Sequence, residues 1–288
     1  MRSLLFVPGD SDRKIAKGLA SAADALILDL EDAVAQDRKQ AARALCAEVL
    51  SQKPAKLIFV RINAFDTPYA VEDLAAVIRH APFGVMLPKC NGAADLQRLD
   101  LMLETLEVRE GIAVGHTKVL PVATETATAV LNLTSGAKLP SRLYGMLWGA
   151  EDLAADIGAL SNRDAAGNYT PLCQLARNLC LLAAASTGTV PVDAVYTNFR
   201  DTEGLRVEAQ DAVRDGFTAK AAIHPDQVET INDVFTPSPE ACAHARQIVA
   251  AFAAAPDSGA VALNGRMLDR PHLRSAHRVL ARAGNPAA

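Results

Sequence analysis

Eight short hydrophobic runs alternate along this chain with longer stretches in which alanine and leucine recur at helical spacing. The runs are apolar on both faces and rich in Val, Ile and Leu, which is typical of strands covered by helices on one side and by a packed interior on the other. Such an eight-fold alternation within about 250 residues predicts an α/β protein with a (β/α)8 TIM barrel; a doubly wound open sheet is the alternative. The expected strands span residues 3–7, 25–30, 57–62, 84–88, 118–123, 143–148, 190–196 and 219–223.

The pattern changes after the eighth run. Residues 236–288 carry signals for a helix that begins near Pro239, a hairpin or extended segment over 260–269, and a last helix from Pro271. We therefore expect a barrel domain over residues 1–235 and a C-terminal extension over 236–288. Such an extension can form a lid over a barrel mouth, pack on an adjacent subunit, or shield the barrel exterior. The barrel helices are expected over 38–50, 71–80, 93–107, 171–187, 202–214 and 226–234.

Composition limits the partners of this chain. It has 288 residues, a formal net charge of −4 and no basic stripe, so nucleic acid is not expected as a partner. No apolar run approaches the roughly 20 residues that cross a bilayer, and no signal peptide is evident, which favours a cytoplasmic protein without a membrane partner. The 5 cysteines are odd in number and form no metal-like CxxC pair, so we expect reduced, mostly buried thiols.

Acidic residues follow several of the expected strands, in the segments 28–32, 124–126 and 149–153. Because the carboxyl ends of barrel strands meet at one open rim, these side chains are expected to converge there on a metal or a substrate. Glu125 and Asp152 come from adjacent strands, and few, all-oxygen protein ligands are typical of a Mg²⁺ site, with Mn²⁺ also possible. The absence of a neighbouring histidine argues against zinc. Capping of the following helix is the alternative role for Asp152.

Other charged residues at strand ends have two interpretations each. Arg61 offers a two-pronged donor for the carboxylate of a small organic acid, but Arg61 and Lys89, each taken alone, fit structural ion pairs better than ligand contacts. Within the acidic segment 28–32, Asp32 lies nearest the expected rim and is our choice for a water-mediated metal contact or proton transfer. His224 ends the eighth run, and a supporting role there is at least as well motivated as catalysis. No GxGxxG or Walker pattern supports a nucleotide site.

These segments together resemble a known family from end to end. The chain is similar to the citrate lyase beta subunit family, within the HpcH/HpaI aldolase and citrate lyase superfamily, and to malyl-CoA and citramalyl-CoA lyases. The resemblance rests on motifs in the same order, at 6–9, 28–34, 60–63, 86–89, 125–126, 148–153 and 265–269.

The resemblance implies a Mg²⁺-dependent barrel that cleaves or forms a carbon–carbon bond in a 3-hydroxy-acyl thioester, usually on coenzyme A. Citryl-CoA, malyl-CoA or citramalyl-CoA would give an acyl-CoA and a 2-oxo acid such as oxaloacetate. By the same resemblance Glu125 and Asp152 bind the metal, Arg61 contacts the substrate, and Asp32 lies near the metal through water. Asp269 belongs to the C-terminal lid, often of an adjacent subunit, and is implicated in proton transfer.

Further expectations accompany this assignment. The backbone amides of Gly149, Ala150 and Glu151 precede a helix and are candidates to bind the acid's remaining oxygens. The family implies a homotrimer or hexamer, and some members act on a substrate carried by an acyl carrier protein. A thioesterase or malate-synthase-like activity, a non-catalytic 2-oxo acid or CoA-binding subunit, and an aldolase that does not use coenzyme A stay open as alternatives.

Overall fold

The structure is a computed structural model that describes residues 1–133 and 138–284. Eight parallel strands pair side by side in the order β5-β4-β3-β2-β1-β8-β7-β6. Parallel bridges from Val119 to Leu143 and from Val122 to Leu147 join the β5 and β6 edges, so the sheet closes and an open doubly wound sheet is excluded. The strands are β1 (Ser3–Pro8), β2 (Ala25–Asp29), β3 (Leu57–Arg61), β4 (Gly84–Leu87), β5 (Lys118–Pro121), β6 (Gly145–Leu147), β7 (Val190–Asp193) and β8 (Ala219–Ala222).

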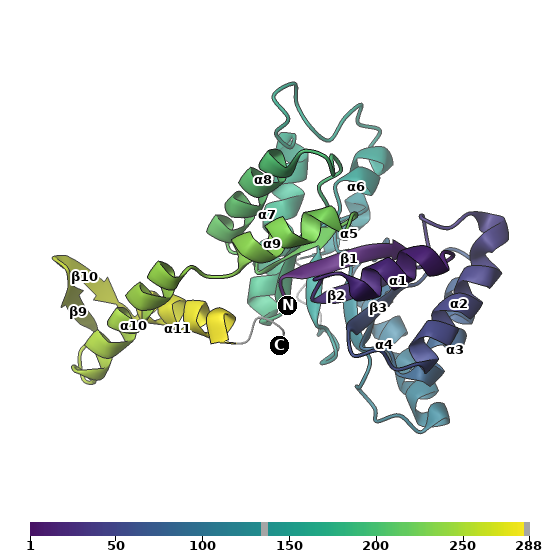
Figure 1. The fold of residues 1–288 in the computed structure, drawn as a ribbon, viewed down its shortest axis with the longest axis horizontal. Coiled ribbons are helices and arrows are strands. Elements are labelled where there is room, and N and C mark those ends of the chain that lie inside the picture. Colours follow the sequence, from purple (N-terminus) through teal and green to yellow (C-terminus); the bar gives the residue numbers. More distant parts are fainter. Residues whose placement is uncertain (134–137, 285–288) are drawn as a thin grey trace.

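Helices surround this barrel (Figure 1). The six expected barrel helices are confirmed, with ends that differ by no more than a few residues, and the segment around residue 78 continues as a 3-10 turn. Three further helices follow β1, β5 and β6, and the last two of them are short. The helices are α1 (Asp12–Ala20), α2 (Lys39–Ser51), α3 (Ala70–Val77), α4 (Ala93–Glu110), α5 (Ala127–Asn132), α6 (Glu151–Asp156), α7 (Pro171–Thr187), α8 (Thr202–Asp215) and α9 (Asp226–Phe235), with 3-10 turns η1 (Gln36–Arg38) and η2 (Ile78–His80).

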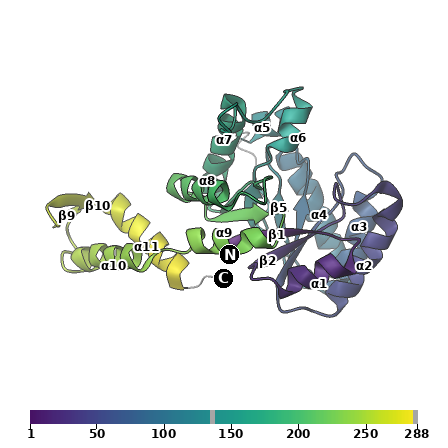
Figure 2. The ribbon, with the colours of Figure 1, turned by 45° about the horizontal axis from the view of Figure 1, so that its top comes forward.

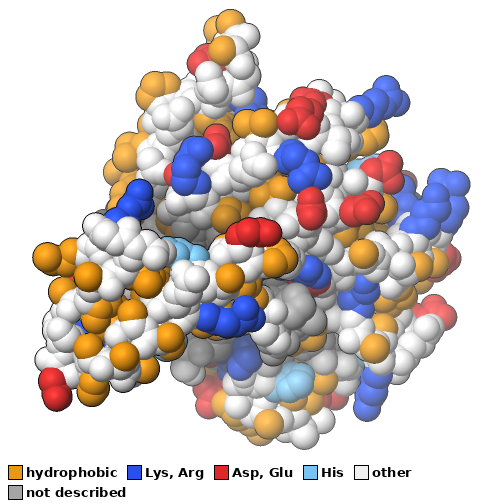
Figure 3. Space-filling view, turned by 60° about the vertical axis from the view of Figure 1, so that its left-hand side comes forward, with side chains coloured by type: hydrophobic (Ala, Val, Ile, Leu, Met, Phe, Trp, Pro, Cys, Tyr) orange, Lys and Arg blue, Asp and Glu red, His pale blue; other side chains and the backbone are white. Residues whose placement is uncertain are grey.

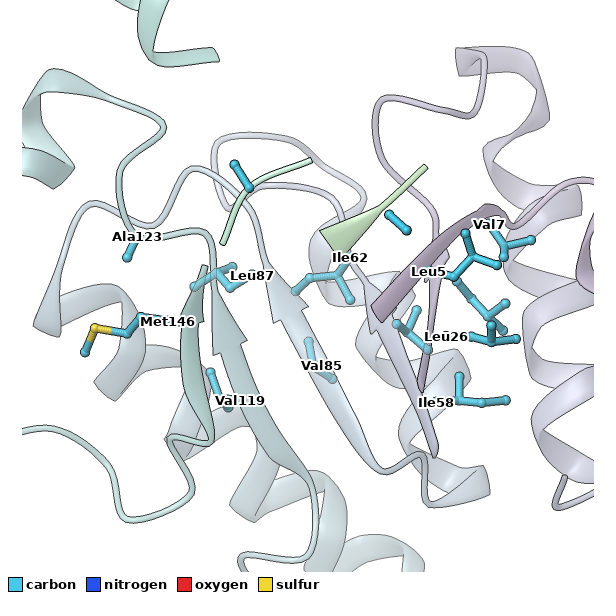
Figure 4. Close-up of a cluster of buried hydrophobic side chains, with 14 of the residues drawn as sticks. Leu5, Val7, Leu26, Ile58, Ile62, Val85, Leu87, Val119, Ala123 and Met146 are labelled. Atoms are coloured by element: carbon cyan, nitrogen blue, oxygen red, sulfur yellow. The ribbon is translucent and has the colours of Figure 1, made fainter. Parts of the chain in front are cut away.

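Alternate strand residues build two hydrophobic layers. Ile27, Phe59 and Leu120 belong to a cluster inside the barrel. Leu26 and Ile58, one residue away, belong to the layer between the sheet and the helices, part of which Figure 4 shows. Because side chains of a strand alternate between its two faces, this assignment also fixes which residue at each strand end points into the barrel mouth.

The C-terminal residues form a small unit that projects from the side of the barrel (Figure 1; Figure 2). An antiparallel hairpin and two flanking helices pack on a core of their own that includes Ile248, Phe252 and Leu268. The expected hairpin and last helix are confirmed, while residues 285–288 of the expected extension lie outside the described residues. The unit consists of α10 (Pro239–Ala253), β9 (Ala260–Leu263), β10 (Arg266–Asp269) and α11 (Arg270–Gly284).

The surface and the thiols agree with the composition. On the face where the C-terminal unit comes forward, basic and acidic side chains are interspersed and no single-sign patch forms (Figure 3). The 5 cysteines are all free and buried, as expected. Among the described helices, none combines the length and apolarity needed to span a membrane.

Candidate active site

Two charged residues at the barrel mouth continue the inward-facing positions of their strands. Ala25 and Ile27 of β2 lie in the interior cluster, so Asp29 is the next inward position at the carboxyl end of that strand. Arg61 holds the same position in β3 after Phe59. The parallel register places Asp29 beside Arg61, so the two strands bring a carboxylate and a guanidinium side by side.

Arg61 is held by two carboxylates. Its Nε donates to Asp29 Oδ1 at 2.7 Å and a terminal nitrogen donates to Asp29 Oδ2 at 2.6 Å. The other terminal nitrogen forms an ion pair with Glu31 at 2.9 Å. Although burial opposes its charged form, the hydrogen bonds to Asp29 raise the pKa of Arg61 further above its ordinary value. Each terminal nitrogen carries a second N–H, so donors remain for a ligand carboxylate.

Lys89 follows β4 and contacts both sides of the site. Its backbone N–H donates to Glu125 Oε2 at 2.6 Å. Its ammonium pairs with Glu31 and lies 3.4 Å from Asp152 Oδ1 and 3.6 Å from Asp32 Oδ2. Its φ of 48° is in the left-handed region, which a side chain larger than glycine adopts rarely and at an energetic cost. The sequence-based interpretation of Lys89 as an ion-pair residue is thus confirmed, and its partners are the site carboxylates.

Glu125 lies nearly buried beside Asp152. Only 4% of Glu125 is exposed, and burial, reinforced by the charge of Asp152, raises the pKa of Glu125 to about 8. Glycine at position 149 permits this placement, because a Cβ there would lie 2.7 Å from Glu125 Cγ. The cap residue of α6 is Ala150, and no side chain caps that helix. Asp152 therefore does not act as its N-cap.

Two cavities meet at this carboxylate pair. One, of about 280 Å³, lies at the barrel mouth and is lined by Arg61, Glu125, Gly149 and Asp152 among mostly apolar residues. The other, of about 510 Å³, opens between the rim loops and contains Lys89, Arg98, Glu125 and Asp152. Glu125 and Asp152 thus border both cavities, which is where residues that bind a small ligand or an ion are expected.

The carboxylate pair fits a Mg²⁺-type ion better than a zinc ion. Within the described residues, no group of three or more His, Cys, Asp and Glu side chains could hold a metal, so an ion here would take two carboxylates and further oxygen ligands from water or substrate. Burial and mutual repulsion disfavour ionised Glu125, and a divalent cation between Glu125 and Asp152 would offset both effects.

Three sequence-based candidates lie elsewhere or at the edge of the site. Asp32 is near the site, but 58% of its side chain is exposed, against 6% for Glu31. Asp269 lies on the projecting C-terminal unit, where it is 2.6 Å from His272 Nδ1, and it lines neither cavity. Gly149 already donates its N–H to the Thr124 hydroxyl at 3.1 Å, which leaves the amides of Ala150 and Glu151 as the candidates for ligand oxygens.

His224 has a supporting environment at the end of β8. Its ring stacks on Phe199 with centroids 4.7 Å apart, and Nδ1 accepts the backbone N–H of Asp226 at 3.3 Å. His224 lines neither of the two cavities described above. These contacts favour the structural interpretation of this histidine.

The sequence interpretation undervalued three residues of the site: Asp29, Glu31 and Lys89. Asp29 and Glu31 fall within the acidic segment 28–32, in which the expected rim position favours Asp32. The available signal was the period of two along β2, which continues from Ala25 and Ile27 to Asp29. For Lys89 the signal is its place at the end of the fourth run, whereas its contacts with Glu125 and Asp152 depend on the folded structure.

A closed (β/α)8 barrel with an arginine, a buried glutamate and a partly exposed aspartate at the carboxyl ends of its strands has the arrangement of a barrel enzyme. Its family is also established. The chain belongs to the HpcH/HpaI aldolase/citrate lyase family, whose model matches residues 2–225. The predicted membership is confirmed, and it identifies the protein as a lyase.

Named relatives cover almost the whole chain. A (3S)-malyl-CoA thioesterase of Cereibacter sphaeroides is 36% identical over 286 residues, which are 98% of this chain and 94% of that protein. A citrate lyase subunit beta-like protein of Mycobacterium tuberculosis is 39% identical over 280 residues, 97% and 94% of the two chains. The crystal structure of the M. tuberculosis protein CitE in complex with magnesium, acetoacetate and coenzyme A matches with a TM-score of 0.81, 37% identity and 98% coverage of both chains.

Proposed function

We propose that this protein is a Mg²⁺-dependent lyase that cleaves or forms a carbon–carbon bond in a 3-hydroxy-acyl-CoA, with an acyl-CoA and a 2-oxo acid as the other reactants. The observation that carries the proposal is the meeting of Glu125 and Asp152 at a cavity that also exposes Arg61. Citryl-CoA, malyl-CoA and citramalyl-CoA are the candidate substrates. The magnesium, acetoacetate and coenzyme A bound by the similar CitE protein support this substrate class.

The residues divide the chemistry between them. Glu125 and Asp152 would hold the metal, Mg²⁺ or Mn²⁺, which when bound supplies Lewis-acid polarisation of a 2-oxo acid carbonyl. Arg61, fixed by Asp29 and Glu31, offers its free N–H donors to the acid carboxylate and adds a preorganised positive charge where negative charge develops on oxygen. The amides of Ala150 and Glu151 are placed to bind another oxygen of the acid. The apolar part of the cavity excludes water from the reacting carbons.

Proton transfer is proposed for Asp269, with Asp32 as a second candidate near the metal. Asp269 is 57% exposed on a unit that projects from its own barrel, and Met267 beside it is 81% exposed. We infer that the unit covers the barrel mouth of an adjacent subunit in a homotrimer or hexamer, where a mobile lid would admit the bulky thioester before closing.

A mixing experiment tests the shared site. Asp152→Ala and Asp269→Ala variants, each inactive, should regain activity when unfolded and refolded together, because some mouths would then combine an intact metal site with an intact lid. The separately refolded variants are the control. Absence of recovery in demonstrably mixed oligomers would place Asp269 outside the reaction of a neighbouring subunit.

The experiment that tests the proposed function is a coupled assay with citryl-CoA, malyl-CoA and citramalyl-CoA, run with Mg²⁺ and with chelator. Release of 2-oxo acid without free thiol, abolished by chelator, would establish the lyase and name its substrate. Silence across the panel would contradict a free coenzyme A substrate and shift the weight to a thioester on an acyl carrier protein or to a non-catalytic binding subunit.

A thioesterase is the second candidate. It is favoured by the similarity to a (3S)-malyl-CoA thioesterase over 98% of this chain, and free thiol in the same assay would identify it.

Because all 5 cysteines are free thiols, we further propose that the enzyme works in the reducing cytoplasm.

A further inference from the structure

The ammonium group of Lys89 occupies the acidic side of the site. We propose that Lys89 is an internal counter-ion that pairs with Asp152 in the metal-free enzyme, must give up this pair when Mg²⁺ binds, and thereby limits the affinity for Mg²⁺. This inference rests on the proposed metal role of Glu125 and Asp152 and adds a determinant of how tightly that metal is held.

The first observation is the set of carboxylates around one ammonium. Lys89 Nζ pairs with Glu31 and lies 3.4 Å from Asp152 and 3.6 Å from Asp32. Glu31 is 6% exposed and also pairs with Arg61, whereas the Asp152 side chain is 33% exposed. The contact with Glu31 is therefore the protected one, and the contact with Asp152 is the one that an ion arriving from solvent can replace.

The second observation is that the backbone of Lys89 is fixed beside the same carboxylate pair. The Lys89 N–H donates to Glu125 Oε2 at 2.6 Å, and the residue is held at a φ of 48°. A left-handed conformation persists in a non-glycine residue only where surrounding contacts compensate for it. One residue thus contacts Glu125 through its backbone and Asp152 through its side chain, so the backbone of Lys89 stays beside the proposed ion site.

The charge of Lys89 should lower the affinity of the site for Mg²⁺. An ammonium is a compact, strongly hydrated point charge. A divalent cation bound by Asp152 would lie within a few ångströms of Lys89 Nζ, where like charges repel strongly in a partly buried site. When Mg²⁺ binds, the ammonium retreats to Glu31, which it already contacts, and Asp152 exchanges one cation for another. Removing the ammonium removes this competition.

The test is Mg²⁺ binding to chelator-treated protein, measured by calorimetry without substrate. Lys89→Met keeps most of the side-chain length and should bind Mg²⁺ about tenfold more tightly than wild type, whereas Lys89→Arg keeps the charge and should stay within roughly threefold of wild type. Lys118→Met is the matched control, because Lys118 is also half-buried but begins β5 at the opposite end of the barrel. Its affinity should equal that of wild type.

The outcomes separate this proposal from the proposed function. A wild-type protein that binds no Mg²⁺ would overturn the metal site and the role of Lys89 with it. Binding by wild type together with equal or weaker binding by Lys89→Met would overturn the role of Lys89 and leave the metal site standing. Circular dichroism verifies the fold, and Lys89→Gln carries the same expectation if the methionine variant does not fold.

Discussion

Two clusters of charged side chains lie within one barrel, and they differ in whether every charge has a partner of the opposite sign. The wall cluster is buried between the sheet and the outer helices, and the rim cluster is at the barrel mouth. The wall cluster consists of Asp193, Glu208 and Lys220. The rim cluster consists of Asp29, Glu31, Arg61, Lys89, Glu125 and Asp152.

The wall cluster satisfies its own charges. The fully buried Lys220 ammonium donates to Asp193 at 2.7 Å, to Glu208 at 2.9 Å and to the Ala194 carbonyl at 2.7 Å. The Trp148 indole donates to the other Asp193 oxygen at 2.7 Å. Although burial opposes its ionisation, the charges of Lys220 and Arg177 lower the pKa of Asp193. Every charge in this cluster thus has a partner of the opposite sign.

The rim cluster leaves one carboxylate without such a partner. Among the described residues, no lysine or arginine forms an ion pair with Glu125, and burial raises its pKa to about 8. A complete buried cluster maintains structure, whereas an incomplete one that faces two cavities indicates a place for a ligand charge.

Removal of Lys220 should disrupt the wall cluster more than any other single change. Lys220→Met leaves Asp193 buried without its main counter-ion and should lower the free energy of unfolding by about 3–5 kcal/mol. Urea titration measures this change, and Lys118→Met, a half-buried lysine, should change it by less than about 0.5 kcal/mol. A loss below about 1 kcal/mol for Lys220→Met would show that the wall cluster contributes little to stability.

Asp152→Ala in the rim cluster should impair metal binding and leave stability almost unchanged. It removes a proposed metal ligand from an open site and creates no core cavity, so Mg²⁺ affinity and turnover should fall at least roughly 100-fold, while the free energy of unfolding changes by less than about 1 kcal/mol. Calorimetry and urea titration measure the two effects. Asp233→Ala, an exposed acid in α9 that lines neither cavity, is the control and should keep the metal. Retained binding in Asp152→Ala would remove it from the metal site.

Stability as a function of pH sharpens the contrast in metal-free protein. Burial and Asp152 raise the pKa of Glu125 from 4.5 to about 8, so its stabilising contribution is full below its unfolded-state pKa and is lost as the pH rises through about 8. Asp193, with its lowered pKa, has the opposite sign, because its contribution is lost as the pH falls. Glutamine does not titrate, so the Glu125→Gln variant lacks this pH-dependent loss. When the pH rises from about 6 to 8, its free energy of unfolding, measured by urea titration, should fall by roughly 2 kcal/mol less than that of wild type. Parallel curves would contradict a raised pKa.

A weaker effect is expected from a change at Gly149, which lies close to Glu125. In Gly149→Ala the new Cβ would meet Glu125 Cγ at 2.7 Å, displace the carboxylate, and weaken Mg²⁺ binding by about tenfold. Gly259→Ala is the control, since a Cβ there meets nothing within 4 Å. Unchanged affinity in Gly149→Ala would show that the turn yields without moving Glu125.

The strands were predictable because each is a short apolar run between helical stretches. The prediction extended seven of the eight strands by 1 to 3 residues toward the mouth. Residues 190–196 were expected in one strand, but β7 ends at Asp193, and Ala194 and Val195 line the cavity. Apolar composition does not distinguish a residue that faces a cavity from one in a sheet. Helices α5 and α6, with 6 residues each, are too short to show a helical period.

Local sequence pattern was sufficient to place Arg61, Glu125 and Asp152 near one another at the barrel mouth, because the ends of the apolar runs can be read along the chain. The pairing of these side chains came only from the folded structure: Asp29 holds Arg61, Glu31 rather than Asp32 is buried, and Lys89 contacts Asp152. Pairing depends on distances between side chains of different strands and on which of them water can reach, and neither quantity is contained in the local sequence.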